Sequence, residues 1–105
     1  MTIYNKLVRD MIPKIISKSG EKASCRILEK DEYLSELDKK LNEECAEYQA
    51  DKSIDELADI LEVIYAIVEA RGHSISDLER VRAEKFSKRG GFANRIYLES
   101  VEDNK

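Results

Sequence analysis

The sequence has few of the residues that cross-link, kink or interrupt a chain. It contains one proline, four glycines and two cysteines in 105 residues, and it lacks tryptophan. With so few helix breakers and 38% charged residues, the composition favours a helical protein with a solvated exterior. Cys25 and Cys45 lie far apart and form no CxxC motif, so we expect free thiols rather than a disulfide or a zinc site. A chain of this length predicts one domain over residues 1–105.

Long apolar runs and an excess of positive charge are also missing. No segment approaches the roughly 20 apolar residues that a membrane-spanning helix needs, so we expect no membrane partner. The N-terminal sequence MTIYNKLVRDMIP is interrupted by Lys6, Arg9 and Asp10, which argues against a signal peptide and for a cytoplasmic protein. The net charge of −4 argues against binding to a nucleic-acid polymer but allows a local basic pocket for phosphates.

The sequence gives little support to nucleophilic catalysis. His73 is the only histidine, and it follows Arg71-Gly72 in a predicted turn. No serine or cysteine stands in a pattern that would place it beside an activating base.

The spacing of apolar residues predicts helices joined by short turns. The predicted elements are a short helix that contains Ile15 and Ile16 and ends at Gly20, a long helix from Glu32 to about Gln49, another from Ser53 to about Arg71, and a last one from near Ser76 to Gly90. Residues 23–28 have the pattern of an extended segment or short strand, and irregular or extended arms are expected at both ends.

The helix that follows Ser53 is apolar around most of its circumference. Only Asp55, Glu62 and Glu69 mark an outward face. Such a helix is buried on most sides. Because one small chain can hardly cover it, we expect it to lie at the interface of a homodimer or homotetramer.

Four carboxylates occupy helical positions where the pattern favours apolar residues. They form two pairs with a spacing of three, Glu44 with Glu47 and Glu56 with Asp59, and residues three apart share a helix face. If the two helices fold against each other, the four like charges meet, and a hard divalent cation such as Mg²⁺ or Mn²⁺ would stabilise them.

The alternative is that these acids are ordinary surface residues and that Glu56 merely completes a capping box with Ser53. Glu43 faces away from the predicted core and fits that alternative better than the others do.

Two basic pairs could bind phosphates. Lys85 and Arg89 are four residues apart on one helix face, and Lys6 and Arg9 lie near the N-terminus. Arginine binds phosphate oxygens in a bidentate manner, and lysine supplies a mobile charge. The alternative is that the first pair compensates the helix dipole and that the second is surface charge.

The acidic residues also resemble a known signature. The sequence Glu43-Glu44-x-x-Glu47 followed by Glu56-x-x-Asp59 resembles the EExxE…ExxD signature of MazG-like all-α nucleoside triphosphate pyrophosphohydrolases. The opening segment 4–13 (YNKLVRDMIP) and the closing segment 85–92 (KFSKRGGF) resemble a branch described as phosphoribosyl-ATP pyrophosphohydrolase-like. The likeness extends over nearly the whole chain.

The resemblance implies an oligomeric, antiparallel all-α helical bundle. It also implies Mg²⁺-dependent cleavage between the α- and β-phosphates of a nucleotide substrate, which yields a monophosphate and pyrophosphate. The implied residues are the metal ligands Glu44, Glu47, Glu56 and Asp59, the catalytic acids Glu43, Glu44 and Glu47, and the substrate-binding cations Lys6, Arg9, Lys85 and Arg89.

One departure from the family pattern concerns the spacer between Glu47 and Glu56, which is short for this superfamily. It leaves no inserted loop to cover a nucleotide, so the two terminal arms, from the same or a partner subunit, would have to close the site. Three functions stay open: hydrolysis of canonical or damaged nucleotides, the same chemistry on phosphoribosyl-ATP in histidine biosynthesis, and a non-enzymatic helical dimerisation or regulatory module.

Overall fold

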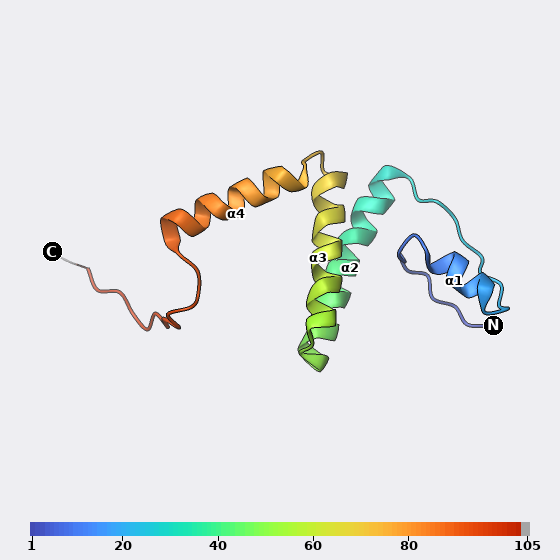
Figure 1. The fold of residues 1–105 in the computed structure, drawn as a ribbon, viewed down its shortest axis with the longest axis horizontal. Coiled ribbons are helices and arrows are strands. Elements are labelled where there is room, and N and C mark those ends of the chain that lie inside the picture. Colours follow the sequence, from blue (N-terminus) through green and yellow to red (C-terminus); the bar gives the residue numbers. More distant parts are fainter. Residues whose placement is uncertain (104–105) are drawn as a thin grey trace. The chain divides into compact units, whose positions relative to one another are not determined.

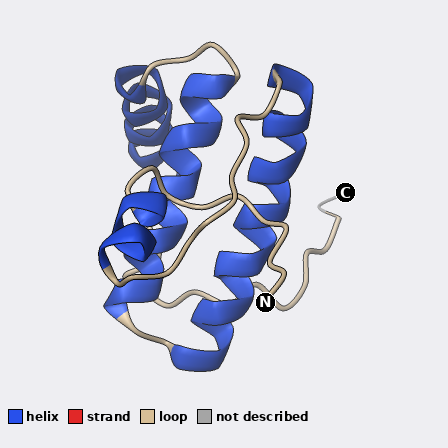
Figure 2. Cartoon of the chain, turned by 90° about the vertical axis from the view of Figure 1, so that its right-hand side faces the viewer, coloured by secondary structure: helices blue, strands red, loops and turns tan. Residues whose placement is uncertain are grey.

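All regular secondary structure in the computed structural model, which describes residues 1–103, is helical. The helices are α1 (Ile12–Lys18), α2 (Lys30–Asp51), α3 (Ile54–Ala70) and α4 (Ile75–Arg89) (Figures 1 and 2). The predicted all-α class and the number of helices are therefore confirmed. Residues 23–28 form an irregular loop rather than a strand, since residues 1–103 offer no second strand with which they could pair.

The chain divides into two compact units. The first runs from Met1 to His73, and the second begins at Ser74. The last two residues of the predicted 1–105 domain lie outside the described part of the chain.

The core of the first unit is the hairpin of α2 and α3, which lie side by side (Figures 1 and 2). Helix α2 ends where Lys52 adopts a left-handed conformation, with φ of 55°. The hydroxyl of Ser53 then accepts a hydrogen bond from the backbone N–H of Glu56, which caps the first turn of α3. The short turn predicted between these two helices is therefore confirmed at Lys52 and Ser53, and it fixes the acids of α2 and α3 on facing segments.

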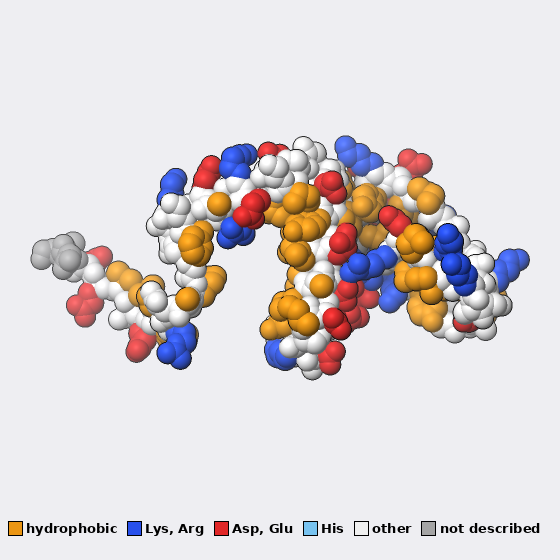
Figure 3. Space-filling view, viewed as in Figure 1, with side chains coloured by type: hydrophobic (Ala, Val, Ile, Leu, Met, Phe, Trp, Pro, Cys, Tyr) orange, Lys and Arg blue, Asp and Glu red, His pale blue; other side chains and the backbone are white. Residues whose placement is uncertain are grey.

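The packing in this hairpin leaves much apolar surface uncovered. Leu37 and Val63 are the apolar residues that the structure buries among residues 1–103. By contrast, Ile54, Leu57 and Leu61 of α3 are 77%, 43% and 45% exposed. Figure 3 shows apolar side chains along one side of α3 and charged side chains along the other.

The predicted starts of two helices need correction. Helix α2 begins at Lys30 with Glu29 as N-cap, two residues before the predicted start at Glu32. Helix α4 begins at Ile75, because Ser74 and Asp77 exchange two hydrogen bonds of 3.0 Å in a capping box. The sequence pattern had placed the start of this helix near Ser76.

The ends of the helices agree better with the pattern. Pro13 lies in the first turn of α1, where its missing N–H costs no helical hydrogen bond. Gly90 follows α4 with φ of 77°, a conformation that favours glycine. None of the helices in residues 1–103 combines the length and the apolar character needed to cross a bilayer.

Candidate functional site

Three of the predicted metal ligands converge in the first unit. One carboxylate oxygen each from Glu44, Glu56 and Asp59 lie within 4.8 Å of one another. Glu44 comes from α2, and the other two come from the first two turns of α3. Glu44 is only 7% exposed, which is unusual for a glutamate. We call these three residues the acid cluster.

Glu47, the fourth predicted ligand, lies beside the acid cluster rather than within it. Its side chain is exposed, and its presence beside Glu44 helps to raise the pKa of that carboxyl group. The hairpin thus brings all four acids into one neighbourhood, with Glu47 on the solvent side.

The surroundings of the acid cluster disfavour the charged carboxylates. Burial, and then the neighbouring Glu47, raise the pKa of Glu44, and Lys40 opposes this effect. Burial, and then the charge of Asp59, raise the pKa of Glu56, with further contributions from Asp51 and Glu44. Both shifts have the sign expected where like charges and desolvation act without a sufficient counter-charge.

One atom of the acid cluster lacks any partner. Glu56 Oε2 is buried and accepts no hydrogen bond. Buried polar atoms are almost always paired, so this oxygen is a free acceptor on one of the three residues of the acid cluster. A set of oxygen-only donors fits Mg²⁺ or Mn²⁺.

Basic side chains surround the acids within the same unit. Arg9 Nη2 is 2.6 Å from Asp59 Oδ1, and Lys6 Nζ is 3.3 Å from Glu43 Oε1. Lys40 Nζ is 3.4 Å from Glu44 Oε1 and 3.6 Å from Glu43 Oε1. Lys6 and Arg9 were predicted from the sequence as substrate-binding residues, whereas Lys40 was not, although its spacing of four from Glu44 predicts an ion pair on one helix face.

Glu43 occupies a different position from the other acids. It lies outside the acid cluster, is half-buried, and pairs with Lys6 and Lys40. Glu43 therefore forms ion pairs with two lysines, one of which, Lys6, belongs to the N-terminal segment.

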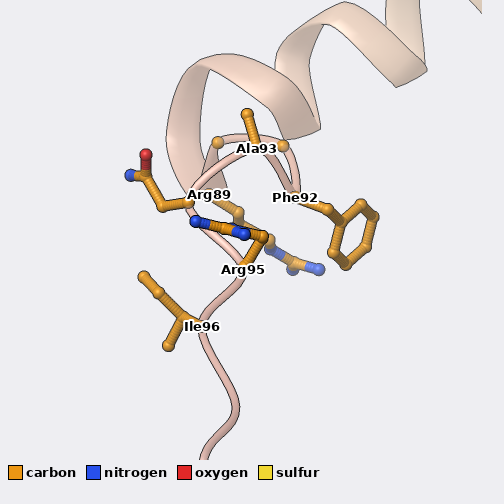
Figure 4. A pocket seen from close by; sticks show the side chains of 8 residues that line it. Arg89, Phe92, Ala93, Arg95 and Ile96 are labelled. Atoms are coloured by element: carbon orange, nitrogen blue, oxygen red, sulfur yellow. The ribbon is translucent and has the colours of Figure 1, made fainter.

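The other two predicted substrate-binding residues belong to the second unit. Lys85 and Arg89 are both exposed on α4. Arg89 lines a pocket of about 190 Å³ together with Phe92, Arg95 and Ile96 of the following segment (Figure 4). Arg95, which the sequence analysis did not consider, has a left-handed φ of 56°.

A further basic residue of α4 is paired within its own helix. Arg82 forms two hydrogen bonds with Glu79, of 2.6 and 2.9 Å. These contacts hold the pKa of Glu79 below its ordinary value. Arg82 is therefore engaged in a local ion pair.

Comparison with known proteins finds a relative that is similar to this chain over part of its length. No family model matches the chain, and no solved structure matches it. A protein of Mycolicibacterium smegmatis, described as uncharacterized, is 51% identical over 45 residues, which are 43% of this chain and 46% of that protein. The match therefore spans less than half of the relative.

Proposed function

We propose that the protein is a Mg²⁺-dependent nucleoside triphosphate pyrophosphohydrolase that cleaves the bond between the α- and β-phosphates. The observation that carries this proposal is the approach of Glu44, Glu56 and Asp59 to within 4.8 Å of one another. These three positions are among the five acids at which the sequence resembles the MazG-like signature.

The proposed ligands are Glu44, Glu47, Glu56 and Asp59. When bound, a divalent cation neutralises phosphate charge and lowers the pKa of a coordinated water. The free acceptor on Glu56 and the effect of the neighbouring Glu47 on the pKa of Glu44 support this ligand set. Mn²⁺ prefers the same donors and should replace Mg²⁺.

Glu44 and Glu47 are the proposed proton acceptors for the attacking water. Glu47 is exposed and adjoins both Glu44 and Glu56, so it combines access to solvent with contact to the ligands. A general base must lie within hydrogen-bonding reach of the water that it activates.

Phosphate binding is assigned to the basic residues. Arg9 and Lys6 already contact acids of the first unit, which supports a role beside a polyphosphate held there. The roles proposed for Lys85 and Arg89 rest on the resemblance, together with the basic character of the Arg89 pocket. Charge-assisted hydrogen bonds of this kind stabilise the charge that develops on the leaving pyrophosphate.

We further propose that the active form is a homodimer or homotetramer. The exposed apolar face of α3, with Ile54, Leu57 and Leu61, supports this assembly. A hairpin with so small a core of its own needs additional apolar burial for stability.

The proposal is tested by incubating the purified protein with Mg²⁺ and a panel of nucleoside triphosphates, damaged nucleotides and phosphoribosyl-ATP. We expect equal amounts of monophosphate and pyrophosphate, and none of either after chelation with EDTA. Orthophosphate as the first product, or no turnover of any substrate, contradicts the proposal. Without turnover, calorimetry with Mn²⁺ and a non-hydrolysable nucleotide analogue tests the regulatory-module alternative.

A further inference from the structure

The N-terminal segment is attached to the α2–α3 hairpin by two ion pairs. Arg9 donates a hydrogen bond to Asp59, 50 residues away in sequence, and Lys6 donates one to Glu43, 37 residues away. Residues 1–9, which carry both cations, have no regular structure. The two ion pairs therefore connect a segment without regular structure to the hairpin.

The contact of Arg9 involves a member of the acid cluster. Asp59 supplies one of the three carboxylates that lie within 4.8 Å of one another, and its Oδ1 is 2.6 Å from Arg9 Nη2. A guanidinium at this distance neutralises part of the carboxylate charge and uses one of its acceptor sites. A cation that binds the acid cluster must therefore share Asp59 with Arg9 or displace it.

Arg9 and Lys40 differ in how readily they can move. Lys40 is on the same helix as Glu44, and its side chain is only 16% exposed, so it stays with its partner. Arg9 is on an irregular segment, and its side chain is 56% exposed. An exposed ion pair of this kind is weak, and its arginine can turn toward another anion at little cost.

We propose that Arg9 is an exchangeable counter-ion that holds Asp59 in the absence of a divalent cation and binds the phosphates of the substrate once the cation is bound. This inference rests on the proposed function, since it takes the acid cluster as the cation site and a polyphosphate as the ligand. Arginine suits both partners because its planar fork matches carboxylate and phosphate oxygens alike. Arg9 is then a positioning residue that links cation binding to substrate binding.

The exchange predicts effects of opposite sign for the two ligands when Arg9 is changed to Gln. Without nucleotide, R9Q removes a competitor, so its affinity for Mn²⁺ alone should rise about two- to fivefold, the effect expected from the loss of an exposed ion pair. With Mn²⁺ at saturation, its affinity for a non-hydrolysable nucleoside triphosphate analogue should fall about tenfold or more, because a charge-assisted hydrogen bond to phosphate is lost. A merely structural role for Arg9 would weaken both.

Arg71→Gln is the matched control. Arg71 pairs with Asp38 of α2 at 3.4 Å, and its side chain is 52% exposed, which is similar to the exposure of Arg9. The substitution R71Q changes the net charge by the same amount as R9Q, but at a position outside the acid cluster. Isothermal titration calorimetry on wild type, R9Q and R71Q measures both affinities, and circular dichroism verifies that each variant is folded. R71Q should match wild type in both titrations.

The outcomes separate this inference from the proposed function. Tighter Mn²⁺ binding and weaker nucleotide binding by R9Q support the exchange. Unchanged or weaker Mn²⁺ binding by R9Q overturns the exchange, while the proposed pyrophosphohydrolase stands if wild type binds the ion and turns over substrate. Failure of wild type to bind Mn²⁺ overturns both. If R9Q binds Mn²⁺ more tightly and the nucleotide more weakly, but the wild type hydrolyses no substrate, the exchange is supported and the proposed enzymatic function is contradicted.

Discussion

Lys40 Nζ lies 3.4 Å from Glu44 Oε1, and both side chains are largely buried on the same helix, with 16% and 10% exposed. Glu44 therefore has a permanent counter-ion one helical turn away. Lys40 lowers the pKa of Glu44, but burial and Glu47 raise it by more. The single positive charge of Lys40 is therefore not enough to balance the negative charges of the acid cluster.

Changing Lys40 to Gln should destabilise the cation-free protein by about 1 kcal/mol or more, because the buried Glu44 loses its partner. Saturating Mg²⁺ should restore part of this loss, since a bound cation supplies the missing charge. Urea unfolding followed by circular dichroism, with and without Mg²⁺, measures both effects.

The neighbouring residue gives a control for this variant. Lys39 pairs with Glu36 at 2.9 Å, but its side chain is 72% exposed, so Lys39→Gln should cost no more than about 0.5 kcal/mol. An equal loss of stability in the two variants would contradict the role of Lys40 as the counter-ion of the acid cluster.

Amide substitutions separate the chemistry of the acid cluster from its contribution to folding. Glu56→Gln and Asp59→Asn keep the size of the side chain and remove one of the like charges that meet in the acid cluster, where burial and the charge of Asp59 raise the pKa of Glu56. We expect kcat to fall at least about 100-fold. Removing a residue that only orients a metal ligand lowers activity by up to about 100-fold, and losing a ligand itself should cost at least as much. The thermal midpoint should stay the same or rise. A pyrophosphate assay and a thermal melt of the same samples measure the two effects.

Glu62→Gln is the control for these variants, because Glu62 is an exposed residue of the same helix and lies outside the acid cluster. Its turnover should equal that of wild type. Unchanged turnover in both Glu56→Gln and Asp59→Asn would refute the assignment of the metal ligands.

The raised pKa values of Glu44 and Glu56 predict an unusual dependence of stability on pH. Between the ordinary glutamate pKa of about 4.3 and the raised pKa in the folded state, the folded protein binds more protons than the unfolded chain does. The stability contributed by these two groups is therefore present below this window and is lost as pH rises through it. Adding Mg²⁺ should weaken this dependence.

The difference in free energy of unfolding between wild type and Glu44→Gln isolates this effect. The advantage of the variant should grow as pH rises above about 4.3 and then level off. Acids whose pKa is lowered, such as Asp77 and Glu79, are present in both proteins and cancel. A constant difference over the whole range would argue against a perturbed Glu44.

The sequence predicted the helices and the approach of the acids because both follow from short-range rules. The three-residue spacing fixes each acidic pair on a helix face, and the turn capped by Ser53 folds one face against the other. The start of α4 was misplaced because Ser74 and Ser76 both precede an acid by three residues. Only the hydrogen bonds of the folded chain identify Ser74 as the cap.

Contacts between distant segments could not be predicted in the same way. The pairing of Arg9 with Asp59 joins residues 50 positions apart, and no periodicity encodes it. Its existence depends on the path of an irregular segment, which is set by tertiary contacts rather than by local propensity. The position of Glu47 at the edge of the acid cluster likewise depends on how α2 and α3 pack.

The exposed apolar face of α3 predicts the surface through which the protein assembles into an oligomer. Leu61 is 45% exposed on a face that it shares with Ile54 and Leu57, so placing a lysine there should disrupt an oligomer without a clash inside the hairpin. We expect Leu61→Lys to sediment as a monomer, and to melt at a lower temperature, because the apolar face loses its cover.

Glu62→Lys is the control, because it introduces the same side chain one position away with a larger change of charge. This variant should keep the mass of the wild-type assembly. Analytical ultracentrifugation over a range of concentrations distinguishes these results. A monomeric wild type, or a Leu61→Lys variant with unchanged mass, would mean that this face of α3 is not the interface, and the stability of the hairpin would then need another source.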